Sequence, residues 1–492
     1  MQNRKLHPLM FVGTGSDVGK SVLAAAFCRI LRQDGYRPAP FKAQNMSLNS
    51  YATPEGLEIG RAQAVQAEAA GVPCHTDMNP ILLKPQSDHT SQVVLNGRPA
   101  GVQTADSYFR REGRAALRQA CHEAFDRLAG RFNPIVMEGA GSISELNLRD
   151  VDLVNMPMAR YAGARVVLVA DIDRGGVFAS VYGSIMLLPP DERALIKGII
   201  INKFRGDLSL FDEGRRILED ICHVPVLGVV PYFSDIHIEE EDSMSLAQKQ
   251  HSRPSGQGKV SVAVVLLRHL SNFTDFDTME RDPRVHLYYA STPADLAEAD
   301  IVILPGTKST IDDLLMLRRS GMAEAVVSAR RRGATVLGIC GGYQMMGREV
   351  CDPDHVEGDQ PRLPGLGLLP VSTTIGGSKL TRQVSGVCQG QRLSGYEIHM
   401  GTTTALQPAE PLLHLDDGSD DGCRADDRCM GTYLHGILDN AAFVDMLLSP
   451  YAHRLRQDEV FDYASYKQQQ YDLLAQHVRR YVDVDAVYRM LE

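Results

Sequence analysis

Residues 9–21 read LMFVGTGSDVGKS, and this stretch decides the fold of the N-terminal half of the chain. A short apolar run over residues 9–12 enters a glycine-rich turn, and a helical stretch over residues 20–34 follows it. Glycines permit a tight turn that aims backbone N–H groups at a phosphate, and the helix N-terminus adds the positive end of its dipole. The order of strand, loop, Gly-Lys-Ser and helix therefore predicts a phosphate-binding loop rather than a plain turn before a helix.

The loop departs at one position from the usual GxxxxGK[ST] spacing, because Thr14 stands where the first glycine belongs. Lys20 is expected to reach the β- and γ-phosphates of ATP, and Ser21 is expected to bind Mg²⁺. We predict that ATP contacts Gly13, Thr14, Gly15, Val18, Gly19, Lys20 and Ser21.

Short apolar runs rich in β-branched residues alternate with helical stretches in both halves of the chain. Continuous apolar strands separated by helices are typical of parallel sheets that are covered on both faces. The fold class is therefore α/β, with two doubly wound parallel-sheet domains. A polar stretch rich in Gly, Pro and Ser separates the two patterns and predicts a linker. The predicted divisions are a P-loop domain (1–246), a linker (247–259), a second domain (260–450) and a helical tail (451–492).

The composition limits the classes of function. The chain has 492 residues and a net charge of −10, which argues against a general nucleic-acid binder. Its nine cysteines are scattered and form no CxxC pair, which predicts neither a zinc site nor a disulfide framework and favours the cytoplasm. Its longest apolar runs are far short of a membrane span, so we expect no membrane partner. The oligomeric state is not predicted.

A second site is predicted around Cys340. Residues 335–346 read TVLGICGGYQMM, a strand, a sharp turn at the cysteine and a helix, which is the layout of a nucleophile elbow. The helix N-terminus favours the thiolate form of such a cysteine. The expected partner is His435, in the stretch GTYLHG over residues 431–436. A lone buried cysteine or histidine is usually structural, but the two together predict acyl transfer from an amide.

The phosphate loop resembles that of dethiobiotin synthetase and its relatives, which read GTxxxVGK[ST] and use ATP to activate a carboxylate or carbamate. The resemblance implies three further roles. Lys42, after the second predicted strand, would be the catalytic lysine. Glu138, in the stretch EGAG over residues 138–141, would bind Mg²⁺. Asn202, after the run at residues 199–201, would read adenine.

The C-terminal half resembles the class I (triad) glutamine amidotransferases. The resemblance implies that Cys340 attacks the glutamine amide and that Gly306 and Gly341 supply the oxyanion hole. Those enzymes usually read His-x-Glu, but here His435 is followed by Gly-Ile. Either another residue supplies the acid or the site is a Cys–His dyad.

Nearly the whole chain resembles the cobyric acid synthase family of vitamin B12 biosynthesis. The most specific motifs are AQNMSLN (43–49), EIGRAQ (58–63), DIDRGGVF (171–178), NKFRG (202–206), LSNFTDF (270–276) and GYEIH (395–399). The resemblance implies ATP- and glutamine-dependent amidation of the b, d, e and g carboxylates of adenosylcobyrinic acid a,c-diamide, a corrinoid polycarboxylate, to give adenosylcobyric acid. By position, Glu58, Asp171 and Asp173 are candidates to touch metal or corrinoid, and Glu58 is predicted as a metal ligand. Structural caps and ion pairs are an equal alternative for all three.

Two alternative functions stay open. The first is cobyrinic acid a,c-diamide synthase, which has the same layout and a different corrinoid substrate; the NMSLNS and DRGGVF stretches favour the cobyric acid synthases. The second is a P-loop ATPase of the partitioning or maturation kind that forms no amide. Such an ATPase would not require Cys340 and His435 in an amidase layout.

Overall fold

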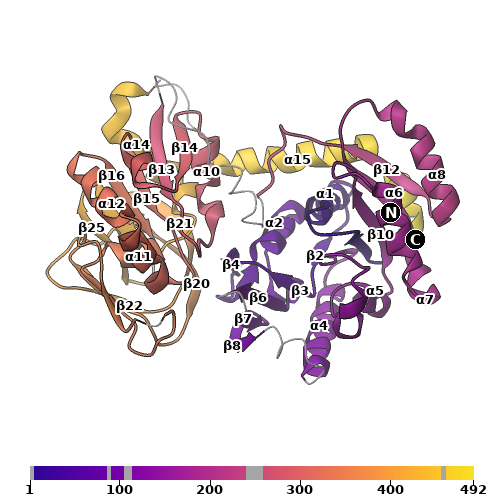
Figure 1. Cartoon of the computed structure of the whole chain (residues 1–492), viewed down its shortest axis with the longest axis horizontal. Coiled ribbons are helices and arrows are strands. Elements are labelled where there is room, and N and C mark those ends of the chain that lie inside the picture. The colour runs from indigo at the N-terminus through magenta and orange to yellow at the C-terminus, as the bar shows by residue number, and fades with distance from the viewer. Residues whose placement is uncertain (1–4, 86–89, 105–112, 240–258, 359, 456–460) are drawn as a thin grey trace. The chain divides into compact units, whose positions relative to one another are not determined.

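The computed structural model describes residues 5–85, 90–104, 113–239, 259–358, 360–455 and 461–492. By their internal contacts they form two compact units (Figure 1). The first unit comprises Met1–Ser47, Ile59–Glu239 and Tyr466–Glu492, and the second comprises Leu48–Glu58 and Glu240–Ser465. The predicted linker lies, apart from its last residue, outside the described residues.

The first unit is built on a six-stranded sheet with the order β12-β11-β10-β1-β9-β2, and every pair in it is parallel. The central strand β1 is completely buried, as the continuous apolar run predicts for a sheet covered on both faces. The strands are β1 (Leu9–Gly13), β2 (Ala39–Phe41), β9 (Ile135–Glu138), β10 (Arg165–Asp171), β11 (Ile196–Phe204) and β12 (Val226–Pro231).

Helices connect these strands, and a smaller sheet lies beside them. The helices are α1 (Lys20–Gln33), α2 (Arg61–Ala70), α4 (Arg114–Ala129), α5 (Met156–Ala162), α6 (Val177–Met186), α7 (Pro190–Arg193) and α8 (Asp212–Cys222). The smaller sheet has the order β3-β6-β7-β8, with β3 (Gln44–Met46), β6 (Ile81–Pro85), β7 (Thr90–Leu95) and β8 (Arg98–Thr104). This smaller sheet was not expected from the sequence.

The C-terminal tail packs into the core of the first unit from Tyr466 onward. Its helices are α15 (Tyr463–Tyr481) and α16 (Val484–Leu491). Leu474 and Val478 of α15 join the same buried cluster as Leu23 and Phe27 of α1. The tail is therefore helical from Tyr463 onward, and from Tyr466 onward it belongs by its contacts to the first unit.

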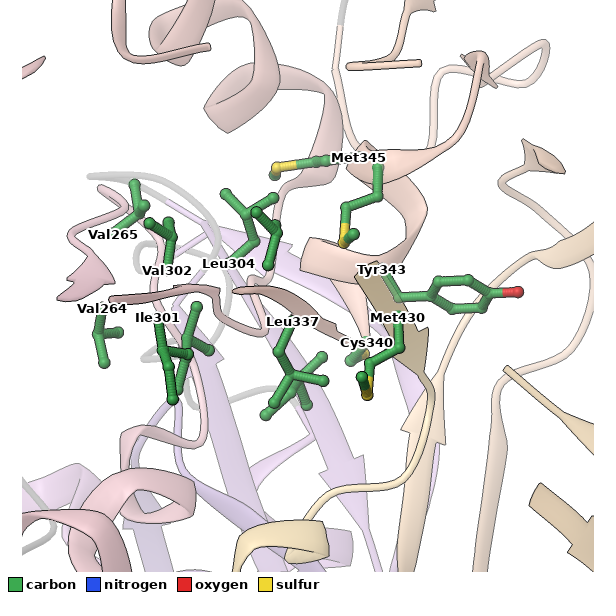
Figure 2. Close-up of a cluster of buried hydrophobic side chains, with 14 of the residues drawn as sticks. Val264, Val265, Ile301, Val302, Leu304, Leu337, Cys340, Tyr343, Met345 and Met430 are labelled. Carbon is green, nitrogen blue, oxygen red and sulfur yellow. The ribbon is translucent and has the colours of Figure 1, made fainter. Parts of the chain in front are cut away.

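The second unit is built on a sheet with the order β14-β13-β15-β16-β26-β25, in which only the β25–β26 pair is antiparallel. Figure 2 shows apolar side chains of β13, β15, β16 and β26 gathered around this sheet, with Cys340 at the end of β16. The strands are β13 (Val260–Val265), β14 (Val285–Ala290), β15 (Ile301–Leu304), β16 (Thr335–Ile339), β25 (Cys423–Asp426) and β26 (Cys429–Thr432).

The rest of the second unit consists of short helices and two small sheets. The helices are α10 (Asp277–Arg281), α11 (Thr310–Arg319), α12 (Met322–Arg331), α13 (Gly341–Met346) and α14 (Ala441–Leu448). One small sheet has the order β18-β17-β19-β22, with β17 (Glu349–Cys351), β18 (Arg362–Pro364), β19 (Val371–Thr374) and β22 (Thr402–Ala405). The other has the order β21-β20-β23-β24, with β20 (Leu380–Cys388), β21 (Gln391–His399), β23 (Leu413–Leu415) and β24 (Asp420–Asp421).

The two predicted doubly wound α/β domains are confirmed, and all nine cysteines are free thiols. Within the described residues, no helix combines the length and the hydropathy that crossing a bilayer requires. Parallel strands bring their carboxyl ends to one edge of a sheet, where α/β proteins bind their ligands. The predicted site residues follow such strand ends in both units, and each unit therefore holds its own candidate site.

Candidate active site

The phosphate loop (residues 13–21) joins β1 to α1 in the first unit. Lys20 Nζ donates to the carbonyl oxygens of Gly15 at 2.8 Å and of Gly141 at 3.0 Å. Gly19 has a φ of 100°, a left-handed conformation that favours glycine. A Cβ on Gly19 would lie 2.1 Å from Asn202 Nδ2, which donates to the Val18 carbonyl at 2.9 Å. The absence of a side chain on Gly19 therefore leaves room for the Asn202 amide, whose hydrogen bond to Val18 stabilises the loop.

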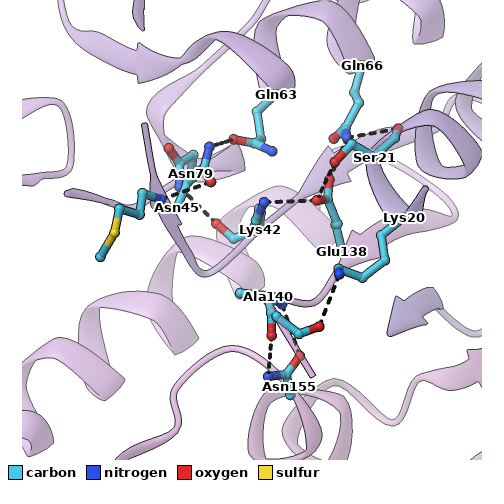
Figure 3. Close-up of polar contacts among 12 residues, drawn as sticks. Lys20, Ser21, Lys42, Asn45, Gln63, Gln66, Asn79, Glu138, Ala140 and Asn155 are labelled. Atoms are coloured by element: carbon cyan, nitrogen blue, oxygen red, sulfur yellow. Dashed lines mark hydrogen bonds and ion pairs between the residues drawn. The ribbon is translucent and has the colours of Figure 1, made fainter. Parts of the chain in front are cut away.

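Glu138 lies at the centre of a buried polar cluster beside this loop (Figure 3). Its Oε1 accepts from Ser21 Oγ at 2.7 Å and from Lys42 Nζ at 2.8 Å. Its Oε2 accepts from Gln66 Nε2 at 2.7 Å. The fold thus brings together three residues that the sequence predicted for one site, Ser21, Lys42 and Glu138.

The electrostatics of the cluster keep Glu138 ionised. Burial by itself would raise the pKa of this carboxyl group, but the Lys42 charge and the hydrogen bonds from Lys42, Gln66 and Ser21 outweigh it and hold the pKa below its usual range. Lys42 and Glu138 are both almost fully buried, so removal of either partner would leave an uncompensated charge.

The donor set of the cluster fits Mg²⁺. The Ser21 hydroxyl and the Glu138 carboxylate are hard oxygen ligands, and Mg²⁺ is usually held by one or two carboxylates together with substrate phosphates and water. Within the described residues, no group of three or more His, Cys, Asp or Glu side chains is arranged to hold a metal ion. Phosphate and water oxygens would therefore complete the coordination.

Glu58, the other predicted metal ligand, belongs by its contacts to the second unit. Its carboxylate is buried and forms an ion pair with Lys379 Nζ at 2.5 Å. Its role as a metal ligand stays a prediction.

Asp171 and Asp173 form ion pairs. Asp171 Oδ2 lies 3.1 Å from Lys203 Nζ, and Asp173 Oδ1 accepts from Arg205 Nε at 2.9 Å. These contacts agree with the structural alternative given for both residues. Asn202 follows β11 as predicted, but its side-chain amide bonds to the phosphate loop, so its contact with adenine stays a prediction.

Two residues of the first site were not singled out from the sequence. Gln66 on α2 holds the second oxygen of Glu138. Asn155 accepts from Ala140 N at 3.0 Å and donates to Ala140 O at 2.9 Å, which fixes the EGAG loop. A Cβ on Gly139 would lie only 2.3 Å from Asn155 Oδ1, so a larger residue here would displace the Asn155 amide that bonds to Ala140. Polar residues in a helix or in a loop carry no distinctive spacing, and the sequence held no signal for either role.

Cys340 occupies the turn between β16 and α13 in the second unit. Its φ of 53° is unusual for a residue with a side chain, and such strain marks a nucleophile elbow. A Cβ on Gly342 would lie 1.9 Å from the Leu304 carbonyl oxygen, so the helix after the turn can approach β15 only with glycine there. The predicted elbow geometry is present.

His435 follows β26, and its ring is held by an aspartate. His435 Nδ1 lies 2.7 Å from Asp275 Oδ2, and the Gly436 N–H donates to Asp275 Oδ1 at 3.1 Å. Both side chains are buried. Because His435 also interacts with the Cys340 side chain by a hydrogen bond, Cys340, His435 and Asp275 form the arrangement of a catalytic triad, in which the acid fixes the tautomer and orientation of the imidazole.

Asp275 is the acid that the sequence left open. It lies 160 residues before His435, in a 3-10 helix over Phe273–Phe276, within the quoted LSNFTDF motif. In the class I amidotransferases the acid usually follows the histidine by two residues. No sequence-spacing rule connects a histidine with an acid 160 residues before it. The motif marked the region but did not reveal the role of this residue.

The surroundings of His435 favour its charged form. Burial by itself lowers the pKa, but the Asp275 charge and the interactions with Cys340 and Asp275 raise the pKa of His435 to about 10. A protonated imidazole at this position can donate a proton to a leaving nitrogen. The Tyr396 ring stacks on the imidazole with centroids 5.3 Å apart.

The two glycines predicted for the oxyanion hole border the triad. Gly341 follows Cys340 at the N-terminus of α13, and a Cβ on Gly306 would lie 3.1 Å from His435 Cε1. Their contact with a tetrahedral intermediate stays a prediction.

Asp275→Asn is expected to lower glutamine hydrolysis by roughly 10²-fold or more, because the imidazole loses the group that sets its tautomer. Loss of the Asp275 charge also lowers the His435 pKa from about 10, so His435 loses its proton at lower pH. The alkaline limb of the pH–rate profile for glutaminase kcat is therefore expected to move to lower pH. An unchanged rate and profile would show that the site works as a Cys–His dyad.

Comparison with known proteins agrees with both sites. Residues 261–443 match the model of the CobB/CobQ-like glutamine amidotransferase domain, and residues 9–246 match that of the CobQ/CobB/MinD/ParA nucleotide binding domain. One chain that joins these two domains defines the class as ATP-dependent, glutamine-hydrolysing amide ligases. Within that class, the chain belongs to the cobyric acid synthase family.

Three relatives establish this membership. The chain is 68% identical to the cobyric acid synthase of Bacteroides fragilis, 65% to that of Phocaeicola vulgatus and 55% to that of Parabacteroides distasonis. Each alignment covers 99% of this chain and 99% of the relative.

Proposed function

We propose that the chain amidates the b, d, e and g carboxylates of adenosylcobyrinic acid a,c-diamide, with glutamine as nitrogen donor and ATP as the activating substrate. The main support for this function is the presence of two sites. One is the Ser21–Lys42–Glu138 cluster at the phosphate loop, and the other is the Cys340–His435–Asp275 arrangement in the second unit. Together they supply an activated carboxylate and ammonia. We propose the cytoplasm as the location.

In the glutaminase site, the Cys340 thiolate attacks the amide carbon of glutamine. His435 gives its proton to the leaving nitrogen, which departs as ammonia and leaves a thioester on Cys340. His435 then accepts a proton from the water that hydrolyses the thioester to glutamate. The N–H groups of Gly306 and Gly341 are proposed to stabilise the oxyanion.

In the ATP site, a carboxylate of the corrinoid attacks the γ-phosphorus of ATP, and ADP leaves. Lys20 and Lys42 provide positive charge around the transferred phosphoryl group, and the phosphate loop holds the triphosphate. Mg²⁺ bound near Ser21 and Glu138 would neutralise further phosphate charge. Ammonia then attacks the acyl phosphate, phosphate leaves, and an amide remains.

Mass spectrometry of the corrinoid product tests the substrate. The full chain with ATP, Mg²⁺ and glutamine is expected to convert cobyrinic acid a,c-diamide into products with one to four additional amides, each with one oxygen replaced by one nitrogen. Activity only on unamidated cobyrinic acid, stopping after two amides, would instead identify a cobyrinic acid a,c-diamide synthase. ATP hydrolysis without any amide would indicate the P-loop ATPase alternative.

A further inference from the structure

A short hairpin from the N-terminal half belongs by its contacts to the amidotransferase unit. This hairpin, Leu48–Glu58, begins six residues after Lys42, yet the chain before and after it belongs to the ATP-side unit. It consists of β4 (Ser50–Ala52), a turn and the start of β5 (Glu58–Gly60). The Glu58–Lys379 ion pair and a bond from Gln383 Nε2 to the Ala52 carbonyl at 3.1 Å fasten it to β20 and the loop before it.

The hairpin holds the loop that carries the triad acid. Asn49 Oδ1 accepts from the Phe273 N–H at 3.1 Å, and the Ser50 N–H donates to Asn272 Oδ1 at 2.9 Å. Asn49 and Asn272 are 2% and 3% exposed, so these bonds are shielded from water. They fix the two residues that begin the short helix of Asp275.

Asn272 also reaches the catalytic histidine. Its Nδ2 lies 3.5 Å from His435 Nε2, on the imidazole atom opposite to the one that Asp275 holds. Asn272 has a φ of 55°, a left-handed conformation that costs free energy unless neighbouring contacts maintain it. The bond with the Ser50 backbone is one such contact.

A second path from the hairpin runs through aromatic rings. The Tyr51 ring packs edge-on against Tyr396 with centroids 4.6 Å apart, and Tyr396 stacks on His435. The backbones of Tyr396 and His435 are joined by two hydrogen bonds, of 3.1 Å and 2.8 Å. The ring of Tyr51 therefore supports the residue that covers the imidazole.

We propose that the hairpin Leu48–Glu58 positions the glutaminase triad, with Asn49 and Tyr51 as its positioning residues. Neither residue would touch glutamine; Asn49 acts through the Asn272–Asp275 loop, and Tyr51 acts through Tyr396. A segment that begins six residues after Lys42 thus determines how well the catalytic groups of the glutaminase site are positioned. This inference rests on the glutaminase part of the proposed function.

Asn49→Ala is expected to lower kcat for glutamine hydrolysis by roughly 10- to 100-fold, since a small misplacement of catalytic groups has effects of this size. KM for glutamine should be unchanged, and amidation driven by ammonium chloride should stay near the wild-type rate. The alkaline limb of the pH–rate profile for glutamine hydrolysis should also move to lower pH. If Asp275 is held less firmly beside His435, its charge raises the His435 pKa by a smaller amount. Glu55→Ala, an exposed residue at the tip of the same hairpin, is the matched control and should change none of these.

Tyr51 gives an independent pair of variants. Tyr51→Phe keeps the ring and should retain glutaminase kcat and pH profile, whereas Tyr51→Ala removes the ring and should lower kcat. Wild-type glutaminase kinetics in Asn49→Ala and Tyr51→Ala would overturn the proposal, as would loss of ammonium-driven amidation in parallel with the glutamine-driven reaction. Failure of the wild-type chain to amidate the corrinoid with ammonium would count against the proposed function instead.

Discussion

Replacing Cys340 by alanine is expected to abolish amidation driven by glutamine while amidation driven by ammonium chloride continues. Cys340 is the only group in this account that forms a bond to glutamine, and removing a covalent nucleophile lowers a rate by several orders of magnitude, roughly 10⁴-fold or more. The acyl phosphate does not depend on the source of its ammonia. Ammonium-driven synthesis should be fastest at higher pH, where free NH₃ is abundant.

His435→Ala should give the same pattern, because its role is to manage the protons of the thiol and of the leaving ammonia. Cys388→Ala is a matched control, since Cys388 is another buried cysteine of the same unit and burial raises its pKa and keeps it a neutral thiol. Persistent glutamine-driven synthesis in Cys340→Ala would exclude Cys340 as the nucleophile. Loss of ammonium-driven synthesis in a folded Cys340→Ala that still binds ATP would refute the division into two sites.

Glu138→Gln is expected to stop amidation from both nitrogen sources, by roughly 10²-fold or more, and to leave basal glutaminase activity intact. The substitution keeps the shape of the side chain but removes the charge that Lys42 and a bound Mg²⁺ need. Initial rates with glutamine and with ammonium chloride, beside glutamate release without corrinoid, provide the measurement. Lys20→Ala should give the same pattern, because it removes a charge that acts only on the phosphates.

Retained glutaminase activity is also the folding control for Glu138→Gln. The cluster is buried and the substitution leaves Lys42 with a neutral partner, so some loss of stability is expected as well. Near-normal amidation by Glu138→Gln or by Lys20→Ala would contradict the assignment of the ATP site.

Local patterns predicted most of the architecture. The apolar runs predicted the parallel strands because a strand buried on both faces needs a continuous apolar sequence. The Gly-Lys-Ser turn and the Gly-Ile-Cys-Gly-Gly turn predicted both loops because each loop is built from adjacent residues. Cys340 could be placed because it follows the end of a strand, where ligands of α/β sheets bind. Lys42 and Glu138 were singled out by the resemblance to the dethiobiotin synthetases, and both lie at or directly after a strand end.

Contacts between distant parts of the chain were not predictable in this way. Asp275 contacts His435 although the two residues are 160 positions apart in the sequence. The hairpin Leu48–Glu58 belongs to the second unit, whereas the residues directly before and after it belong to the first. Likewise, Tyr466–Glu492 joins the first unit through apolar side chains whose partners lie on α1. Such pairings depend on the tertiary arrangement, and a single sequence carries no periodicity that specifies them.

A double isotope experiment tests most directly that one chain couples carboxylate activation to glutamine hydrolysis. The full chain receives ATP, Mg²⁺, glutamine labelled with ¹⁵N in its amide, and cobyrinic acid a,c-diamide labelled with ¹⁸O in its carboxylates. The account predicts one ¹⁸O in the released phosphate and one ¹⁵N in the corrinoid for each ATP consumed, because the acyl phosphate passes a carboxylate oxygen to phosphate. Phosphate without ¹⁸O, or a corrinoid without ¹⁵N, would contradict it.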